Sequence, residues 1–107
     1  MEVPEIDVTE LARRWEAGAT VVDVRNPDEY EEGHVPGARL VPLPELPDRQ
    51  GEIPADGEVL VICKSGGRSL QAAEFLRQRG VDAVNVAGGT TAWIEAGHPV
   101  VAGNQPG

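Results

Sequence analysis

The stretch Val59-Leu60-Val61-Ile62-Cys63-Lys64-Ser65-Gly66-Gly67-Arg68-Ser69 leads from an apolar run through a glycine-rich loop into a helical pattern. Four consecutive apolar residues predict a strand that is buried on both faces. The chain's only cysteine ends this run, and two glycines separate it from the helix. Strand, short loop and helix form the repeating unit of α/β folds. The stretch therefore predicts an α/β fold with Cys63 at the C-terminal edge of a central strand.

Predicted strands and helices alternate along the rest of the chain. Apolar runs bounded by turn residues predict further strands at residues 20–24, 39–41, 83–86 and, near the end, 100–101. Helical spacing and capping residues predict helices between Asp7 and Gly18, at 26–29, at 69–79 and around 92–94. Residues 42–57 contain four prolines and two glycines, which predict a surface loop with at most one helical turn. We expect a mostly parallel central β-sheet of about five strands with helices on both faces.

Length and charge narrow the class of protein. The 107 residues fit a single domain, residues 1–107, with its core at roughly 5–102 and a tail at 103–107 that we expect to fray. The net charge of −9 disfavours nucleic acid and anionic membranes as partners, because both need a basic surface. The first residues lack the pattern of a signal peptide, and no run approaches the ~18 apolar residues of a membrane span. We therefore expect a cytoplasmic protein and a monomer.

The single cysteine restricts the chemistry of the chain. One cysteine cannot form an intramolecular disulfide, and zinc sites of the Cys₂ and Cys₄ types need at least two. We therefore expect no zinc site of these types, and we expect no metal or organic cofactor. A thiol at a helix start is instead a candidate nucleophile, because unpaired backbone N–H groups and the helix dipole favour the thiolate.

The residues that follow Cys63 favour anion binding. Gly66 and Gly67 let backbone N–H groups approach a bound atom closely, and successive N–H groups that point inward form an anion nest. Lys64, the only lysine, and Arg68 add positive charge, which we expect to lower the pKa of Cys63. The candidate catalytic residue is Cys63, and the candidate substrate-binding residues are Lys64, Ser65, Gly66, Gly67, Arg68 and Ser69.

Other charged residues have simpler interpretations. Asp23 lies in the predicted strand at 20–24 and Arg25 follows it, and we expect the two to form a supporting ion pair near the site rather than to act chemically. The acidic run at 28–32 predicts a solvated face. His34 lies in a predicted turn and is expected to hold it by hydrogen bonds.

Four blocks of sequence resemble the rhodanese-like sulfurtransferase family, and in particular its single-domain members. They are Cys63–Ser69, Val22–Arg25 with Glu29-Tyr30, Gly33–Ala38, and Val86–Trp93 with Ala96–Val100. The resemblance implies a rhodanese-like fold and a Cys63 persulfide that moves sulfane sulfur from thiosulfate or another persulfide donor to a thiol or cyanide acceptor. The implied partners are a small sulfur-containing anion or a protein or low-molecular-weight thiol.

Two alternatives remain open on the sequence. The first is a phosphatase or arsenate reductase, but these related domains carry one more residue in the loop, whereas only four residues separate Cys63 from Arg68 here. The second is a non-enzymatic sulfur-relay or protein-interaction module of the same fold. An intact cysteine disfavours an inert module but agrees with a relay.

Overall fold

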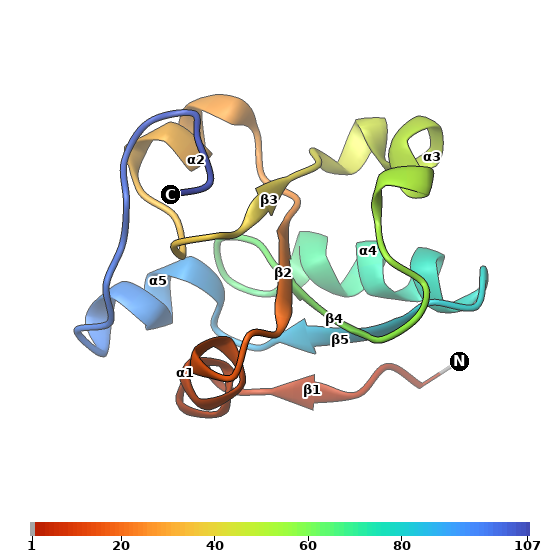
Figure 1. The fold of residues 1–107 in the computed structure, drawn as a ribbon, viewed down its shortest axis with the longest axis horizontal. Helices are drawn as coiled ribbons and strands as arrows, with labels where there is room; N and C mark the ends of the chain where they lie inside the picture. The colour runs from red at the N-terminus through yellow and green to blue at the C-terminus, as the bar shows by residue number, and fades with distance from the viewer. Residues whose placement is uncertain (1) are drawn as a thin grey trace.

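The structure is a computed structural model that describes residues 2–107, and its centre is a five-stranded sheet (Figure 1). The elements in chain order are β1 (Glu5–Ile6), α1 (Val8–Glu16), β2 (Thr20–Asp23), α2 (Pro27–Glu32), β3 (Arg39–Leu40), η1 (Leu43–Glu45), α3 (Leu46–Arg49), η2 (Gln50–Glu52), β4 (Glu58–Ile62), α4 (Gly67–Arg77), β5 (Asp82–Val86) and α5 (Gly89–Glu95). The strand order is β1-β5-β4-β2-β3, and all neighbouring strands run parallel. The predicted α/β class is confirmed.

The central strand β4 occupies the position that its apolar run predicts. It pairs with β2 on one side and with β5 on the other, and Val59 to Ile62 are completely buried. Because parallel strands end at the same edge of the sheet, the residues after β2 and β4 are brought close together. Cys63 lies at this edge, one residue beyond β4.

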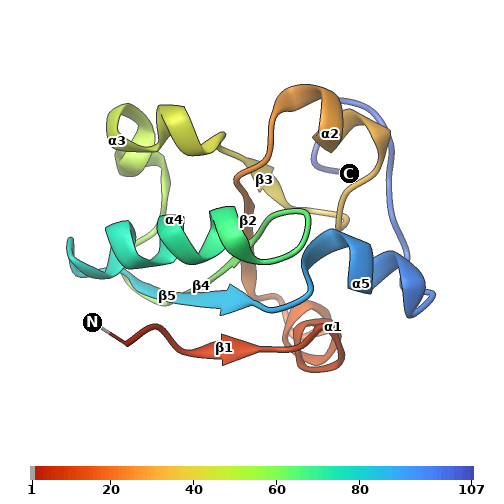
Figure 2. The ribbon, with the colours of Figure 1, turned by 180° about the vertical axis from the view of Figure 1, so that it is seen from behind.

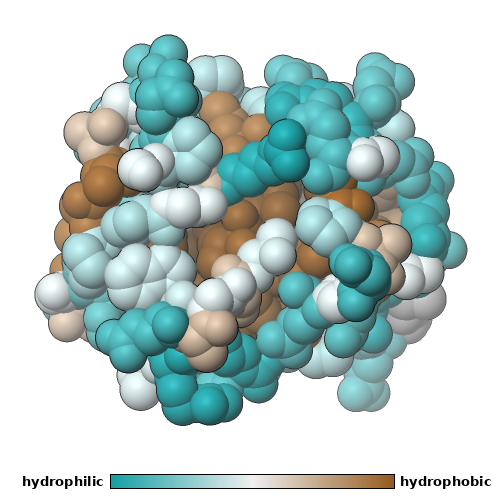
Figure 3. All heavy atoms as spheres, in the orientation of Figure 1, coloured by the Kyte–Doolittle hydropathy of each residue, from teal (hydrophilic) through white to brown (hydrophobic). Residues whose placement is uncertain are grey.

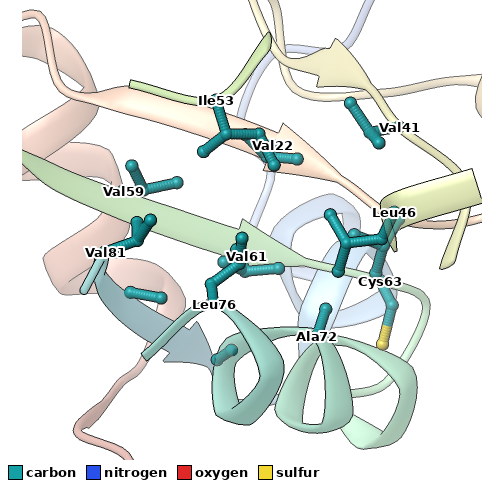
Figure 4. Packing of buried hydrophobic residues seen from close by; sticks show 13 residues of the cluster. Val22, Val41, Leu46, Ile53, Val59, Val61, Cys63, Ala72, Leu76 and Val81 are labelled. Atoms are coloured by element: carbon teal, nitrogen blue, oxygen red, sulfur yellow. The ribbon is translucent and has the colours of Figure 1, made fainter. Parts of the chain in front are cut away.

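Helices cover both faces of the sheet, as predicted (Figure 2). On one face, alternate β4 residues Val59 and Val61 pack with Leu76 of α4 and with Leu46 of α3 (Figure 4). On the other face, Leu60 and Ile62 belong to a second buried cluster that contains Leu11 of α1 and Trp93 of α5. The period-2 alternation of a strand thus sends its residues into two separate cores.

The fifth strand is not the predicted one. It is Glu5–Ile6, which pairs parallel with β5, whereas Val101 of the predicted strand at 100–101 forms only an isolated antiparallel bridge to His34. Two residues are too few to give an alternating pattern, so the sequence carried no signal for β1. Backbone hydrogen bonds from Asn85 to Pro4 and from Ala87 to Ile6 hold β1 in place.

The segment at 42–57 contains more helix than predicted. Three consecutive short helices, η1, α3 and η2, fill residues 43–52, where at most one turn was expected. Pro44 and Pro47 each lie in the first turn of a helix, where the missing N–H group has no intrahelical partner to lose. Leu46 and Ile53 are buried in the core and fix this segment to the sheet.

The C-terminal residues contact the body of the protein, and the expected fraying of residues 103–107 stays a prediction. Gly37 donates a backbone hydrogen bond of 2.7 Å to Pro106, and Gly103 donates one of 2.8 Å to Glu31. The buried ring of His34 has Nδ1 2.8 Å from the Tyr30 carbonyl and Nε2 2.9 Å from the Gln105 carbonyl. Figure 1 shows the last residues rising from α5 to lie beside α2. His34 thus has the scaffold role that its turn predicts.

The face shown in Figure 3 contains a groove beside the beginning of β2. Its volume is about 430 Å³, and Val21, Val22 and Pro106 are among its lining residues. Figure 3 shows apolar atoms in the middle of this face and hydrophilic residues around much of its margin. The groove borders the start of β2 and so lies away from the strand ends that carry Cys63.

Among residues 2–107, no helix has both the length and the apolar character needed to cross a bilayer.

Candidate functional site

The Cys63 side chain lies inside the turn between β4 and α4. Gly66, the residue before α4, has a φ of 115°, a conformation that strongly favours glycine. This backbone turn brings the Gly66 N–H to 3.1 Å from Cys63 Sγ, and the Ser69 hydroxyl lies 3.2 Å from the same sulfur. Figure 4 shows the sulfur beside the start of α4. Gly66 and Ser69 of the predicted loop therefore contact the sulfur, and Cys63 is only 1% exposed.

Hydrogen bonds from the loop favour the thiolate form of Cys63. Burial by itself raises the pKa of Cys63, but the Ser69 hydroxyl and the backbone N–H groups of Ser69, Gly66 and Ser65 lower it by more. The net result is a pKa below the ordinary value for a thiol. Lys64 and Arg68 were expected to contribute as well. Arg68 and the Cys63 sulfur attract each other electrostatically, which agrees with a contribution from Arg68, while a contribution from Lys64 stays a prediction. The donors nearest the sulfur are neutral, and Lys64 extends from the exposed side of the loop.

Arg68 is engaged by a carboxylate. Its Nη1 and Nη2 lie 2.7 and 2.8 Å from the two carboxylate oxygens of Glu29, which joins the start of α4 to α2. Glu29 also accepts a 3.0 Å hydrogen bond from the backbone of Asn26, the residue that precedes α2. The expectation that the whole acidic run is a solvated face is therefore wrong for Glu29. Direct anion binding by Arg68 stays a prediction.

We expect the variant Glu29→Gln to lower the free energy of unfolding by about 1 kcal/mol at neutral pH, since the pair is partly exposed and screened by solvent. Hydrogen bonds from Arg68 lower the pKa of Glu29 from 4.5 to about 2. A lowered pKa stabilises the fold above the unfolded-state value, and this contribution is lost as the pH falls from 4.5 toward 2. Urea unfolding across this range should show the difference from the parent protein shrinking.

The matched control for this measurement is Glu31→Gln, which removes the same charge from the same helix. The Glu31 side chain is exposed and forms no ion pair among the described residues. Its replacement should therefore leave the stability almost unchanged. Equal effects of the two variants would show that net charge, and not the pair with Arg68, is responsible.

Asp23 and Arg25 form the ion pair that the sequence predicts. Both are buried, and Arg25 Nη2 lies 2.8 Å from Asp23 Oδ2 and 2.9 Å from the Gly33 carbonyl oxygen. Among residues 2–107, no hydrogen bond or ion pair joins either side chain to Cys63. The pair therefore connects the end of β2 to the turn after α2, while its effect on the chemistry stays a prediction.

The start of α5 packs against the Cys63 loop and forms hydrogen bonds with its backbone. The backbone N–H and the hydroxyl of Thr90 both donate hydrogen bonds of 2.9 Å to the Cys63 carbonyl, and Thr91 N–H donates one of 3.1 Å to the Lys64 carbonyl. The approach is so close that a Cβ atom at Gly89 would lie 2.5 Å from the Lys64 carbonyl oxygen. Gly89 thus allows the helix and the loop to meet, whereas a Cβ at Gly67 would meet no atom within 4 Å.

A polar cleft of about 230 Å³ borders the loop at Lys64. Its lining residues are Arg25, Glu29, Glu32, Gly33, Lys64, Thr90, Thr91 and Ile94. Cys63 is absent from this lining, because its side chain turns toward α4. Since Arg25 and Glu29 are already paired, Lys64 and Glu32 are the charges of the lining that remain available to a ligand. Among the described residues, no group of three or more His, Cys, Asp or Glu side chains could hold a metal ion.

Sequence reasoning missed Asn85, a residue of β5 whose side chain contacts the Cys63 loop. Its Oδ1 is 2.5 Å from Ser69 Oγ, and its Nδ2 is 2.7 Å from Glu5 Oε2. A polar residue within the apolar run Ala83-Val84-Asn85-Val86 could have signalled a buried hydrogen-bonding role. The contribution of Glu5 could not be anticipated, because β1 itself was not predicted.

Comparisons with known proteins agree with this geometry. Residues 7–96 match the Rhodanese-like domain family. A "Sulfurtransferase" of Allochromatium vinosum is 42% identical over 103 residues, covering 94% of this chain and 96% of the relative. The crystal structure of a rhodanese-related protein from Thermoplasma volcanium superimposes with a TM-score of 0.87 at 39% identity, covering 92% of this chain and 97% of the other. A "Putative sulfur carrier protein YrkF" of Bacillus subtilis is 34% identical over 94 residues, which are 85% of this chain and 51% of the relative.

The match spans most of the chain, including the thiol loop, and the solved relative has the same fold. Named relatives include both a sulfurtransferase and a proposed sulfur carrier. The chain belongs to the rhodanese-like domain family, a family of sulfurtransferases and sulfur carriers.

Proposed function

We propose that this protein is a sulfurtransferase that carries sulfane sulfur as a persulfide on Cys63. The observation that carries the proposal is the set of hydrogen-bond donors around Cys63 Sγ, from Gly66 and Ser69, at the start of a helix. These donors stabilise an anionic sulfur without a neighbouring base, so the attacking thiolate is present before substrate arrives. The short loop, with four residues between Cys63 and Arg68, favours a sulfur atom over the larger phosphate group.

The proposed cycle has two displacement steps. In the first, the Cys63 thiolate attacks the outer sulfur of thiosulfate; a new S–S bond forms, the S–S bond of thiosulfate breaks, and sulfite leaves with the electron pair. In the second, cyanide or an acceptor thiolate attacks the outer sulfur of the persulfide, and the Cys63 thiolate leaves. The loop N–H groups are fixed by the fold, so they stabilise the sulfur anions without reorganisation.

Intact mass spectrometry tests the proposal directly. After exposure to thiosulfate, we expect the protein to gain the mass of one sulfur atom, and we expect cyanide to remove it with release of thiocyanate. Treatment with a reductant should also restore the starting mass. A protein that stays unmodified with thiosulfate and with other persulfide donors would contradict the proposal.

A sulfur relay to a protein partner is a second candidate. The similarity to the proposed sulfur carrier of Bacillus subtilis favours it. A relay would load Cys63 in the same way but would transfer the sulfur faster to a protein thiol than to cyanide. Transfer rates to the two acceptors, measured from the same preloaded persulfide, distinguish the candidates.

A further inference from the structure

Asn85 connects the Cys63 site to the edge strand of the sheet. The residue lies in the middle of β5 and is only 1% exposed. Its side-chain oxygen lies 2.5 Å from Ser69 Oγ, and its side-chain nitrogen lies 2.7 Å from a carboxylate oxygen of Glu5 and 3.3 Å from the Gly66 carbonyl oxygen. Every polar atom of this buried side chain is therefore paired.

The orientation of the Asn85 amide follows from its partners. The Glu5 carboxylate and the Gly66 carbonyl can only accept hydrogen bonds, so the amide nitrogen must face them. The amide oxygen then faces Ser69 and can only accept. The two oxygens are 2.5 Å apart, and this separation requires a proton between them. Ser69 therefore donates its hydroxyl hydrogen to Asn85 in this arrangement.

A serine hydroxyl has only one hydrogen, yet Ser69 Oγ has two neighbours that can accept it. Besides Asn85 Oδ1, the sulfur of Cys63 lies 3.2 Å from Ser69 Oγ. When Cys63 is a thiolate, donation to sulfur removes the hydrogen from Asn85. When the sulfur is a neutral thiol or the inner atom of a persulfide, the hydrogen can return to Asn85. The amide oxygen and the thiolate thus compete for one proton donor.

We propose that Asn85, oriented by Glu5, is a positioning residue that competes with the Cys63 thiolate for the hydroxyl hydrogen of Ser69. This competition limits the stabilisation of the thiolate, so the sulfur remains a reactive nucleophile, because nucleophilicity falls as a thiol becomes more acidic. The same competition favours the persulfide, whose inner sulfur no longer needs the donor. This second effect rests on the proposed persulfide function, whereas the competition itself does not.

Several other charged groups lie around the thiol and must stay constant in any test. They are Lys64 in the loop, Arg68 of α4 with its partner Glu29 of α2, the Asp23–Arg25 pair after β2, and Glu5 of β1. The variants Asn85→Ala and Ser69→Ala change none of these charges. A change in the pKa of Cys63 in those variants can therefore be assigned to hydrogen bonding.

The test is the pH dependence of Cys63 alkylation by iodoacetamide in the full chain, without any sulfur donor. We expect Asn85→Ala to lower the alkylation midpoint, and Ser69→Ala to raise it, each by about one pH unit, the size of a single hydrogen bond. The double variant should match Ser69→Ala alone, because Asn85 acts only through Ser69. An unchanged or raised midpoint in Asn85→Ala, or an effect of Asn85→Ala that persists without Ser69, would overturn the proposal.

Glu5 provides a second test that does not alter the buried core. Glu5→Ala removes the acceptor that orients the amide and is expected to lower the midpoint, as Asn85→Ala does. Glu5→Gln removes the same charge but keeps an acceptor oxygen, so its midpoint should stay nearer that of the parent protein. Equal midpoints for the two Glu5 variants would contradict the orienting role.

A control separates this effect from a general loss of stability. Val81→Ala removes methyl groups from the buried cluster that also contains Cys63. Val81 forms no hydrogen bond with Ser69 or Asn85 among the described residues. It should lower the melting temperature without moving the alkylation midpoint. These measurements contain no sulfur donor, so a midpoint that does not shift as expected would not affect the persulfide proposal. Conversely, a protein that forms no persulfide would leave the midpoint result valid.

Discussion

Replacing Cys63 with serine is expected to lower sulfur transfer from thiosulfate to cyanide by at least about 1,000-fold, in the range seen when an enzyme loses its nucleophile. Cys63 is the only thiol in the chain, so no other residue can carry a persulfide. A serine hydroxyl remains protonated at neutral pH, and the donors from Gly66 and Ser69 cannot ionise it. Steady-state release of thiocyanate measures the loss, and intact mass should show no added sulfur.

The fold of the Cys63→Ser variant should survive. The serine oxygen can accept the hydrogen bond that the Gly66 N–H now gives to sulfur, and the Ser69 hydroxyl lies beside the same position. A thermal melt close to that of the parent protein would confirm this. Gln71→Ala, on the exposed side of α4, is a suitable control and should retain full activity. Transfer by Cys63→Ser at a rate near the parent's would refute a persulfide on this residue.

The part of the fold that sequence predicts best is the part with a continuous local signal. The apolar run at 59–62 and the glycine-rich loop place β4, Cys63 and α4 correctly, because a buried parallel strand needs such a run and a tight turn needs glycine. β1 has only two residues and is stabilised by pairing with β5, which lies about 80 positions away in sequence. Its position is a tertiary effect that no local pattern contains.

The candidate site also has a part that local sequence predicts and a part that depends on tertiary contacts. The identity of Cys63 and of its donors follows from their positions in one loop, so the sequence could place Gly66 and Ser69 around the sulfur. The partners of Arg68 and Ser69 come instead from α2 and β5. Predicting that Arg68 binds Glu29 requires the distance between two helices, which sequence spacing alone does not provide. Sequence spacing therefore did not reveal that Arg68, whose charge also acts on Cys63, is paired with Glu29.

The Asp23–Arg25 pair should have the largest effect on stability. We expect Asp23→Ala to lower the free energy of unfolding by about 3–5 kcal/mol, because it leaves the guanidinium of Arg25 buried without its carboxylate. Only the Gly33 carbonyl would remain as a partner for that side chain. The whole domain is expected to have a stability of only about 5–15 kcal/mol, so the loss is a large fraction of it. Urea denaturation with intrinsic tryptophan fluorescence would measure it.

Two further variants show whether the unpaired charge is the cause. Glu45→Ala breaks the exposed pair with Arg49 and should cost less than about 1 kcal/mol, because solvent screens that charge. The double variant Asp23→Ala/Arg25→Met replaces the stranded guanidinium with an apolar side chain of similar length. It should recover part of the lost stability, since a buried ion pair can be replaced by apolar groups at little cost. If the double variant is less stable than Asp23→Ala, the hydrogen bond from Arg25 to Gly33, rather than the unpaired charge, determines the stability of this edge of the sheet.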